Sequence, residues 1–276
     1  MRYVPAMNAF ALLIAGLLAA FSPAAADPRE SVLKELVPTG KLRVAVGVGP
    51  VASAFYCTRD PLSGLPRGVA VDLGAELSRM LRVPVEFVEY QSSGEITEAG
   101  KTGAWDVTFM PVDSDRAKEV EFGPAYYKFE STYLVPKGSA IKAIEDVDRP
   151  GVRVIGIANT ATGRAAAAVL KHASFKTFRS VVELQEEVRA GRADAVALSR
   201  DSLRNFALAF PGSHVLTGHF FTSRVAAAVP KGHLEALAFV KAFVENAKFT
   251  GSVRRALDGA GLQEAAEATP QTIQKN

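Results

Sequence analysis

The chain has 276 residues, of which 48% are hydrophobic and 22% are charged, and this composition excludes intrinsic disorder, collagen and coiled coil. Its 32 Lys and Arg residues against 29 Asp and Glu residues give a net charge of +3 with no long block of one sign, which argues against nucleic-acid binding. Cys57 is the single cysteine and the four histidines show no ligand spacing, so we expect no disulfide, metal or other cofactor.

Residues 1–26 have the pattern of a cleaved signal peptide. Arg2 precedes an uncharged apolar run over residues 9–21, which is shorter than the roughly 20 residues that span a membrane. Alanines at 24–26 form a small-residue cleavage site, so the mature chain is expected to begin at Asp27 and to be exported, most simply to a periplasm. The alternative is a buried N-terminal helix.

From Lys41 the chain alternates short β-branched runs with amphipathic helical patterns, which predicts parallel strands joined by crossover helices. In the first helical pattern Val69, Leu73, Leu77 and Met80 share one face. A first series of strands and helices is predicted, in chain order, at residues 42–48, 68–81, 84–90, 95–101 and 105–112. Cys57 falls in a predicted loop and carries no catalytic signal without a nearby base.

A second series has the same strand, helix, strand, helix, strand rhythm. It is predicted, in chain order, at residues 152–158, 162–171, 175–178, 181–190 and 193–198. Extended runs flank it, and a long amphipathic helix follows with Leu234, Leu237, Phe239, Val240 and Val244 on its apolar face.

The fold class is therefore α/β, with two Rossmann-like lobes joined by a two-strand hinge and a ligand cleft between them. Lobe 1 is predicted to comprise residues 27–130 and 226–276, and lobe 2 residues 131–225. The hinge crossings are expected near residues 131–137 and 222–230.

Five fragments resemble, in the family's order, the type II periplasmic binding fold and specifically solute-binding protein family 3, the receptors of polar amino acid ABC importers. They are GKLRVAVGVGP (40–50), SGLPRGVAVDLGAEL (63–77), VPVEFVEY (83–90), DRAKEVEFGPAYY (115–127) and GRADAVALSRD (191–201).

The resemblance implies a set of ligand-binding residues in the cleft. Arg116 matches the family arginine that pairs with the ligand carboxylate, for which a guanidinium offers two parallel donors. Thr162 matches a position that usually contacts the same carboxylate, and Asn159 and Ala161 lie beside it before a helix. The alternatives are a solvated Arg116 and a helix-capping role alone for Thr162.

The chain also departs from the amino acid receptors. Ser199, followed by Arg200, stands where those receptors commonly carry an Asp that pairs with the ligand ammonium. The aromatic residue that often covers the ligand in those receptors is replaced here, although Phe55 follows closely. A shortened segment places Met110 and Val112 on an apolar wall. We therefore expect a carboxylate ligand without an α-ammonium group, unless Asp113 or Asp201 supplies the missing partner.

These features predict a non-enzymatic, monomeric periplasmic receptor that captures a small carboxylate and delivers it to the membrane subunits of an ABC importer. Aromatic residues Trp105, Tyr126 and Tyr127 are expected in the core. Two alternatives stay open: an enzyme on this fold, such as a cyclohexadienyl dehydratase, which needs a positioned acid, and a ligand sensor that docks on a histidine kinase.

Overall fold

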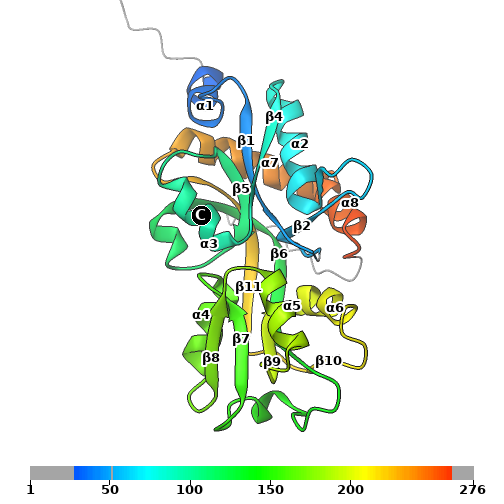
Figure 1. Ribbon diagram of the computed structural model, residues 1–276. Helices are drawn as coiled ribbons and strands as arrows, with labels where there is room; N and C mark the ends of the chain where they lie inside the picture. Colours follow the sequence, from blue (N-terminus) through cyan, green and yellow to red (C-terminus); the bar gives the residue numbers. More distant parts are fainter. Residues whose placement is uncertain (1–27, 51, 263–276) are drawn as a thin grey trace, which may run out of the picture.

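The computed structural model describes residues 28–50 and 52–262, so the expected cleavage site and Asp27 lie outside the described residues. Within these ranges the chain forms two lobes, one above the other in Figure 1, connected by two long strands. No helix in the described part of the chain is both long enough and apolar enough to span a membrane.

The upper lobe in Figure 1, lobe 1, holds the first strands of the chain and its last helices. Its elements are α1 (Pro28–Leu36), β1 (Leu42–Val48), β2 (Tyr56–Arg59), β3 (Pro66–Arg67), α2 (Val69–Leu81), β4 (Val85–Tyr90), α3 (Ser93–Gly100), β5 (Val107–Pro111), the 3-10 helix η1 (Arg116–Lys118), α7 (Leu234–Phe249) and α8 (Ser252–Gly259).

The lower lobe, lobe 2, is built from the middle of the chain, and two strands cross between the lobes. Its elements are η2 (Ile144–Asp146), β7 (Arg153–Ile157), α4 (Ala161–Val169), β8 (Ser174–Phe178), α5 (Val181–Arg189), β9 (Ala195–Ser199), α6 (Arg200–Ala207) and β10 (His214–Val215). The crossing strands are β6 (Val120–Val135) and β11 (Phe221–Pro230).

The strands form one mixed sheet in the order β3-β2-β1-β5-β11-β6-β9-β7-β8, with β4 paired to β1 and β10 paired to β6. β1 is parallel to β2, β4 and β5, and β7 is parallel to β8 and β9, as the crossover pattern predicts. β11 and β6 run antiparallel to each other between these two parallel groups. The α/β fold class is confirmed, while the lobe boundaries near residues 130 and 226 stay a prediction.

Each lobe contains an Arg–Asp pair that joins two neighbouring parallel strands, β1 to β5 in lobe 1 and β7 to β9 in lobe 2. In lobe 1, Asp106 accepts hydrogen bonds from the backbone and the guanidinium of Arg43. In lobe 2, Asp194 accepts the same set of bonds from Arg153. Because each Asp immediately precedes its strand, β5 or β9, the bidentate pair fixes the register of the neighbouring parallel strands.

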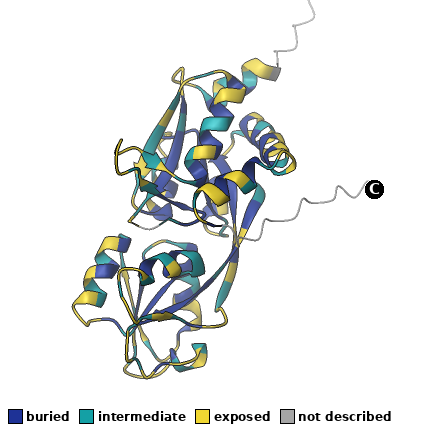
Figure 2. Ribbon diagram, turned by 90° about the vertical axis from the view of Figure 1, so that its right-hand side faces the viewer, coloured by how far each residue is buried: buried dark blue, intermediate teal, exposed yellow. Residues whose placement is uncertain are grey.

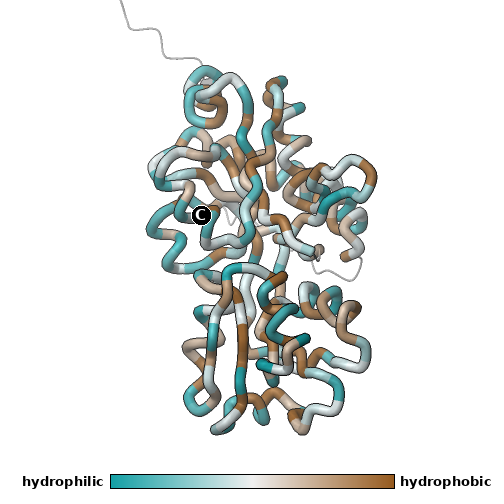
Figure 3. The backbone as a smooth tube through the Cα atoms, in the orientation of Figure 1, coloured by the Kyte–Doolittle hydropathy of each residue, from teal (hydrophilic) through white to brown (hydrophobic). Residues whose placement is uncertain are grey.

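The apolar faces of the helices pack on the sheet, and exposed residues gather on the outer helix faces and loops (Figure 2). Figure 3 shows hydrophobic residues along the central strand of lobe 2. Two residues predicted on the apolar faces of helices are not buried: Met80, at the end of α2, is 45% exposed, and Leu234, at the start of α7, is 61% exposed. Both lie in a terminal turn of their helix.

Cys57 lies in β2 and is fully buried, so its predicted place in a loop is wrong. Burial raises the pKa of its thiol to about 12, which keeps it protonated and unreactive at neutral pH. Trp105 and Tyr126 are buried in the core as expected, and the Trp105 indole donates to the carbonyl of Ile96.

Candidate functional site

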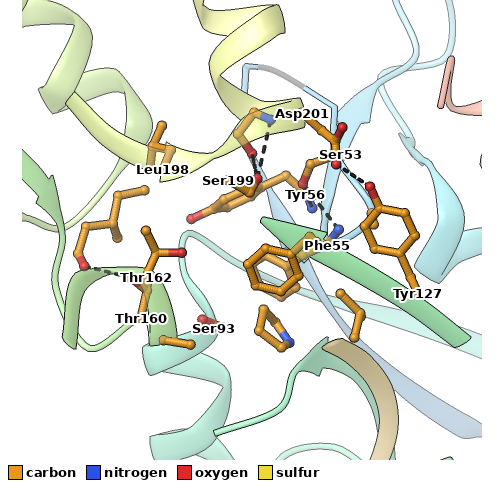
Figure 4. Close-up of a pocket in the computed structure, with 17 residues that line it drawn as sticks. Ser53, Phe55, Tyr56, Ser93, Tyr127, Thr160, Thr162, Leu198, Ser199 and Asp201 are labelled. Carbon is orange, nitrogen blue, oxygen red and sulfur yellow. Dashed lines mark hydrogen bonds between the residues drawn. The ribbon is translucent and has the colours of Figure 1, made fainter. Parts of the chain in front are cut away.

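A cavity of about 50 Å³ lies between the lobes (Figure 4), which is room for a few water molecules or a small solute. Its lining comes from the loops and strand ends of both lobes. From lobe 1 and the crossing strands the lining residues are Ser53, Ala54, Phe55, Tyr56, Ser93, Pro111, Tyr127, Phe129 and Val225. From lobe 2 they are Ile157, Thr160, Ala161, Thr162, Leu198, Ser199, Asp201 and Ser202.

The loop before β2 supplies the aromatic wall. The Ser53 hydroxyl accepts hydrogen bonds from the backbone amides of Phe55 and Tyr56, which closes a tight local turn. The two rings then meet edge to face at 4.7 Å between centroids. A side chain at Gly47 would lie 2.5 Å from the Phe55 ring, so the glycine in β1 makes room for this aromatic.

The start of α4 forms the lobe 2 wall. Thr160 caps the helix by accepting from the amide of Gly163 at 3.0 Å, so the capping residue is Thr160 and not Thr162. Thr162 lines the cavity and its hydroxyl lies 2.8 Å from the hydroxyl of Ser131 on β6. This pair leaves Thr162 with further donor or acceptor capacity toward a ligand.

Arg116 lies directly behind the cavity wall. Its side chain is buried, and the residue is 2% exposed. Its guanidinium donates to the Pro111 carbonyl at 2.7 Å, to the Ser93 hydroxyl at 2.7 Å and to the Asn159 carbonyl at 3.0 Å. Ser93 lines the cavity, so its side chain lies between the Arg116 guanidinium and the cavity.

The guanidinium of Arg116 makes its hydrogen bonds to neutral groups, two carbonyl oxygens and one hydroxyl. Burial, followed by the charge of Arg164, lowers the pKa of Arg116 to about 10, and the nearby Asp113 offsets this only in part. The Nε of Arg116 and the Tyr56 hydroxyl have no hydrogen-bond partner among the described residues, although both are buried. Tyr56 lines the cavity and interacts electrostatically with Arg116, so its hydroxyl is an unpartnered donor close to the buried cation.

The opposite charge lies on α6. Asp201 lines the cavity from the first turn of this helix, and Ser199 caps the helix by accepting from the amide of Ser202. Tyr127, on β6, donates its phenol hydrogen to Asp201 Oδ2. Burial, and then the charge of Asp201, raises the pKa of Tyr127 far above its ordinary value, so the phenol stays a donor.

The two lobes also contact each other directly around the cavity. Arg164 on α4 forms an ion pair with Asp113 after β5, with 2.6 Å between Nη2 and Oδ1. Asn205 on α6 donates to the carbonyl of Ala52 at 2.6 Å. These bonds, with the one from Arg116 to Asn159, describe a closed arrangement of the lobes.

Four of the predicted site residues line the cavity: Phe55, Ala161, Thr162 and Ser199. Arg116 and Asn159 lie behind its wall and are hydrogen-bonded to each other. Met110 and Val112 do not line it, because Pro111 between them faces the cavity and successive strand residues point to opposite sides. Arg200 does not line it either, since its guanidinium bonds to Glu130 and to the carbonyls of Leu216 and Gly218.

Among the lining residues, the prediction missed Tyr56 and Ser93, and it named Asp201 only as an alternative partner for a ligand ammonium. Ser93 follows Ser92, which caps α3 by accepting from the amide of Glu95, so this helix start was visible in the sequence as a capping pattern. Tyr127 is buried as expected but also lines the cavity.

Two α/β lobes, two crossing strands and a small cavity at the lobe interface are the architecture of a protein that holds a solute between its lobes. The family model of bacterial extracellular solute-binding proteins, family 3, matches residues 46–259, so this chain belongs to that family.

Named relatives agree with this assignment. The ABC transporter glutamine-binding protein GlnH of Bacillus subtilis (strain 168) is 26% identical over 204 residues, which cover 71% of this chain and 73% of that protein. The crystal structure of the ancestral amino acid-binding protein AncCDT-1, a precursor of cyclohexadienyl dehydratase, has a TM-score of 0.71 and 30% identity, covering 82% of this chain and 97% of its own. A solute receptor for L-cysteine of Neisseria gonorrhoeae has a TM-score of 0.72 at 22% identity, covering 80% and 89%, and shares the type II periplasmic fold.

Proposed function

We propose that this chain is an exported, monomeric receptor that closes around a small carboxylate-bearing solute and presents the closed form to the membrane subunits of an ABC importer. Membership of the solute-binding family supports the receptor role, and the Bacillus relative is itself named as an ABC transporter binding protein. The signal-peptide pattern of residues 1–26 supports export to a periplasm.

The observation that carries the proposal is the buried guanidinium of Arg116. A buried charge whose hydrogen bonds go only to neutral oxygens is destabilised, and a carboxylate is the group that compensates it best. A carboxylate placed beside Ser93 would accept from that hydroxyl or, after a small shift, from Arg116 itself. The unpartnered Tyr56 hydroxyl at the same end would supply a further donor.

Apolar side chains form the middle of the cavity, including Phe129, Ile157, Leu198 and Val225. They support binding of a solute with a compact apolar body, because contact with these side chains removes apolar surface from water. The small volume in the closed arrangement means that a larger solute would enter only with the lobes further apart.

The test begins with protein purified from an exporting host. Small molecules released by denaturation are identified by mass spectrometry, and each is then added back in a thermal-shift assay. A true ligand at 100 times its Kd stabilises the fold by about 2.7 kcal/mol, which for a chain of this size raises Tm by roughly 5 to 11 °C. If no small carboxylate is released and none in a broad panel raises Tm, the receptor proposal is wrong.

The enzyme alternative has a separate test. AncCDT-1 is named as a dehydratase precursor, and a dehydratase needs an acid positioned at a leaving hydroxyl. Among the described lining residues the carboxyl group is that of Asp201, and one of its oxygens already accepts a hydrogen bond from Tyr127. Turnover of prephenate or arogenate by the purified protein would favour the enzyme over the receptor.

A further inference from the structure

The ion pair between Arg164 and Asp113 joins the two lobes outside the cavity. Arg164 belongs to α4 of lobe 2, and Asp113 follows β5 of lobe 1. The guanidinium donates from Nε to Asp113 Oδ2 at 3.1 Å and holds Nη2 at 2.6 Å from Oδ1. Neither residue is among the described residues that line the cavity, so this contact joins the lobes whether or not a solute fills the cavity.

Asp113 is held in place by lobe 1 alone. Its Oδ1 accepts hydrogen bonds from the backbone amides of Asp115 at 3.0 Å and of Arg116 at 3.2 Å, in the same short loop. The carboxylate therefore loses little freedom when the lobes close, which reduces the usual entropic cost of an ion pair. The side chain of Asp113 is 11% exposed and that of Arg164 is 33% exposed, so the two charges attract each other more strongly than a fully exposed pair.

Asp113 also offsets the repulsion between two cations. Burial lowers the pKa of Arg116 most, the charge of Arg164 lowers it further, and the charge of Asp113 raises it. Both Arg164 and Asp113 are thus within electrostatic reach of the buried guanidinium of Arg116. Because Arg164 belongs to the other lobe, closure brings it toward a second cation, and without the carboxylate this approach would be repulsive.

We propose that Asp113 and Arg164 form an electrostatic latch, which holds the lobes together before a solute binds and in which Asp113 neutralises the repulsion between Arg164 and Arg116. This inference concerns the regulation of the proposed binding site and rests on the proposed receptor function. Because a solute held between the lobes is bound by the closed form, the fraction of empty receptor that is closed scales the affinity. The latch therefore tunes affinity without contacting the solute.

The experiment measures the distance between the lobes in protein without solute. Spin labels attached at Thr102→Cys in lobe 1 and at Thr177→Cys in lobe 2, both exposed positions, give the closed and open fractions by double electron–electron resonance. Cys57 is fully buried and stays unlabelled. The protein is unfolded, dialysed and refolded before labelling, and mass spectrometry checks that no small molecule remains bound.

The labelled wild type is compared with Asp113→Asn, with Arg164→Gln and with the double variant. Asn at position 113 keeps an oxygen that can accept from the same backbone amides, so the loop of lobe 1 retains its hydrogen bonds. Glu187→Gln is the matched control, because it removes one carboxylate from a bidentate pair with Arg192 that lies entirely within lobe 2. Circular dichroism checks that each variant is folded.

We expect a closed fraction in the empty wild type. Asp113→Asn should lower the ratio of closed to open protein by about two- to fivefold, the range that measured ion pairs support. Arg164→Gln should lower it less, because this change removes the repulsion with Arg116 together with the attraction to Asp113. Adding Asp113→Asn to Arg164→Gln should therefore have no further effect, and Glu187→Gln should leave the ratio at the wild-type value.

The outcomes separate the inference from the proposed function, because the labels report on empty protein. If the empty wild type is entirely open, or if Asp113→Asn keeps its closed fraction, the inference is wrong and the receptor proposal stands. A double variant as open as Asp113→Asn would overturn the neutralising role of Asp113. Should Asp113→Asn fail to fold, Arg164→Gln decides, and an unchanged closed fraction in that variant overturns the inference. If no solute binds in the thermal-shift screen, the receptor proposal fails and the role of the latch in affinity fails with it.

Discussion

Gly94 on α3 lies where lobe 1 comes close to the loop of lobe 2 that contains Asn159. A Cβ atom at this residue would lie 2.6 Å from Cβ of Asn159 and 3.2 Å from its carbonyl oxygen. Real Cβ atoms do not approach other atoms so closely, and the obstacle is the lobe 2 loop rather than the end of a flexible side chain. Gly94→Ala should therefore prevent full closure without touching the cavity.

The expected effects on stability and on binding have opposite signs. Alanine suits a helix better than glycine by roughly 0.5 to 1 kcal/mol, so Tm without ligand should stay the same or rise by about 1 to 4 °C. Overpacking typically costs about 1 to 3 kcal/mol, and since this falls on the closed state it corresponds to a loss of affinity of about 5- to 150-fold.

Calorimetry with the ligand that the screen identifies measures the loss, and small-angle scattering shows whether the liganded variant stays more extended. Gly123→Ala is the matched control, since its new methyl group would make an ordinary 3.4 Å contact within lobe 1. Asn159 has φ of 55°, which glycine adopts readily, so Gly94→Ala with Asn159→Gly removes the closest contact and should recover much of the affinity. Unchanged affinity in Gly94→Ala would refute the close approach of α3 and α4 in the bound state.

Further predictions concern Arg116, the ion pair of Asp113 and the mature N-terminus. Arg116→Ala should weaken ligand binding at least about tenfold while the protein stays folded. Arg116→Lys should not fully restore binding, because an ammonium group lacks the paired donors of a guanidinium. Equal calorimetric affinity in Arg116→Ala and the wild type would show that Arg116 is not part of the site. Burial raises the pKa of Asp113, but the hydrogen bond and charge of Arg164 outweigh burial, so the pKa is lowered overall. The ion pair therefore stabilises the folded protein fully at pH values above the ordinary pKa near 4, and this stabilisation is lost as the pH falls through the lowered pKa. Melting curves from pH 3 to pH 7 should therefore show less loss of stability in acid for Asp113→Asn than for the wild type, and parallel curves would contradict this. Intact mass of the exported protein should place the mature N-terminus within a few residues of Asp27, and retention of Met1 would contradict export by cleavage.

Much of the fold was predictable because the parallel strands are short, apolar and bounded by polar turns. Strand β1 matches its predicted range, and β7 lies one residue inside its predicted range at each end. The helix α6 was not predicted, since its eight residues carry only two large apolar side chains, Leu203 and Phe206, which anchor it in the core. Asp201, which carries the negative charge of the cavity wall, was therefore named from the sequence without a place in the fold.

The location of the site was predictable from the lobes, but the direction of its side chains was not. Arg116 illustrates the reason. The sequence places an arginine after a shortened strand-to-helix segment, yet whether its guanidinium enters the cavity depends on where the Pro111 carbonyl and the Ser93 hydroxyl stand, and these belong to different elements. Such positions arise only once the chain has packed.

The positions of Arg116 and Asp201 also bear on how this protein distinguishes a bound from an empty cleft. Arg116 in lobe 1 donates a hydrogen bond to the carbonyl of Asn159 in lobe 2. Asp201 in lobe 2 accepts a hydrogen bond from Tyr127 on the crossing strand β6. A solute that contacts the groups at either end would therefore strengthen the closed arrangement at that end. Because a ligand shifts a conformational equilibrium only by its differential affinity for the two states, two such ends favour closure more than either alone.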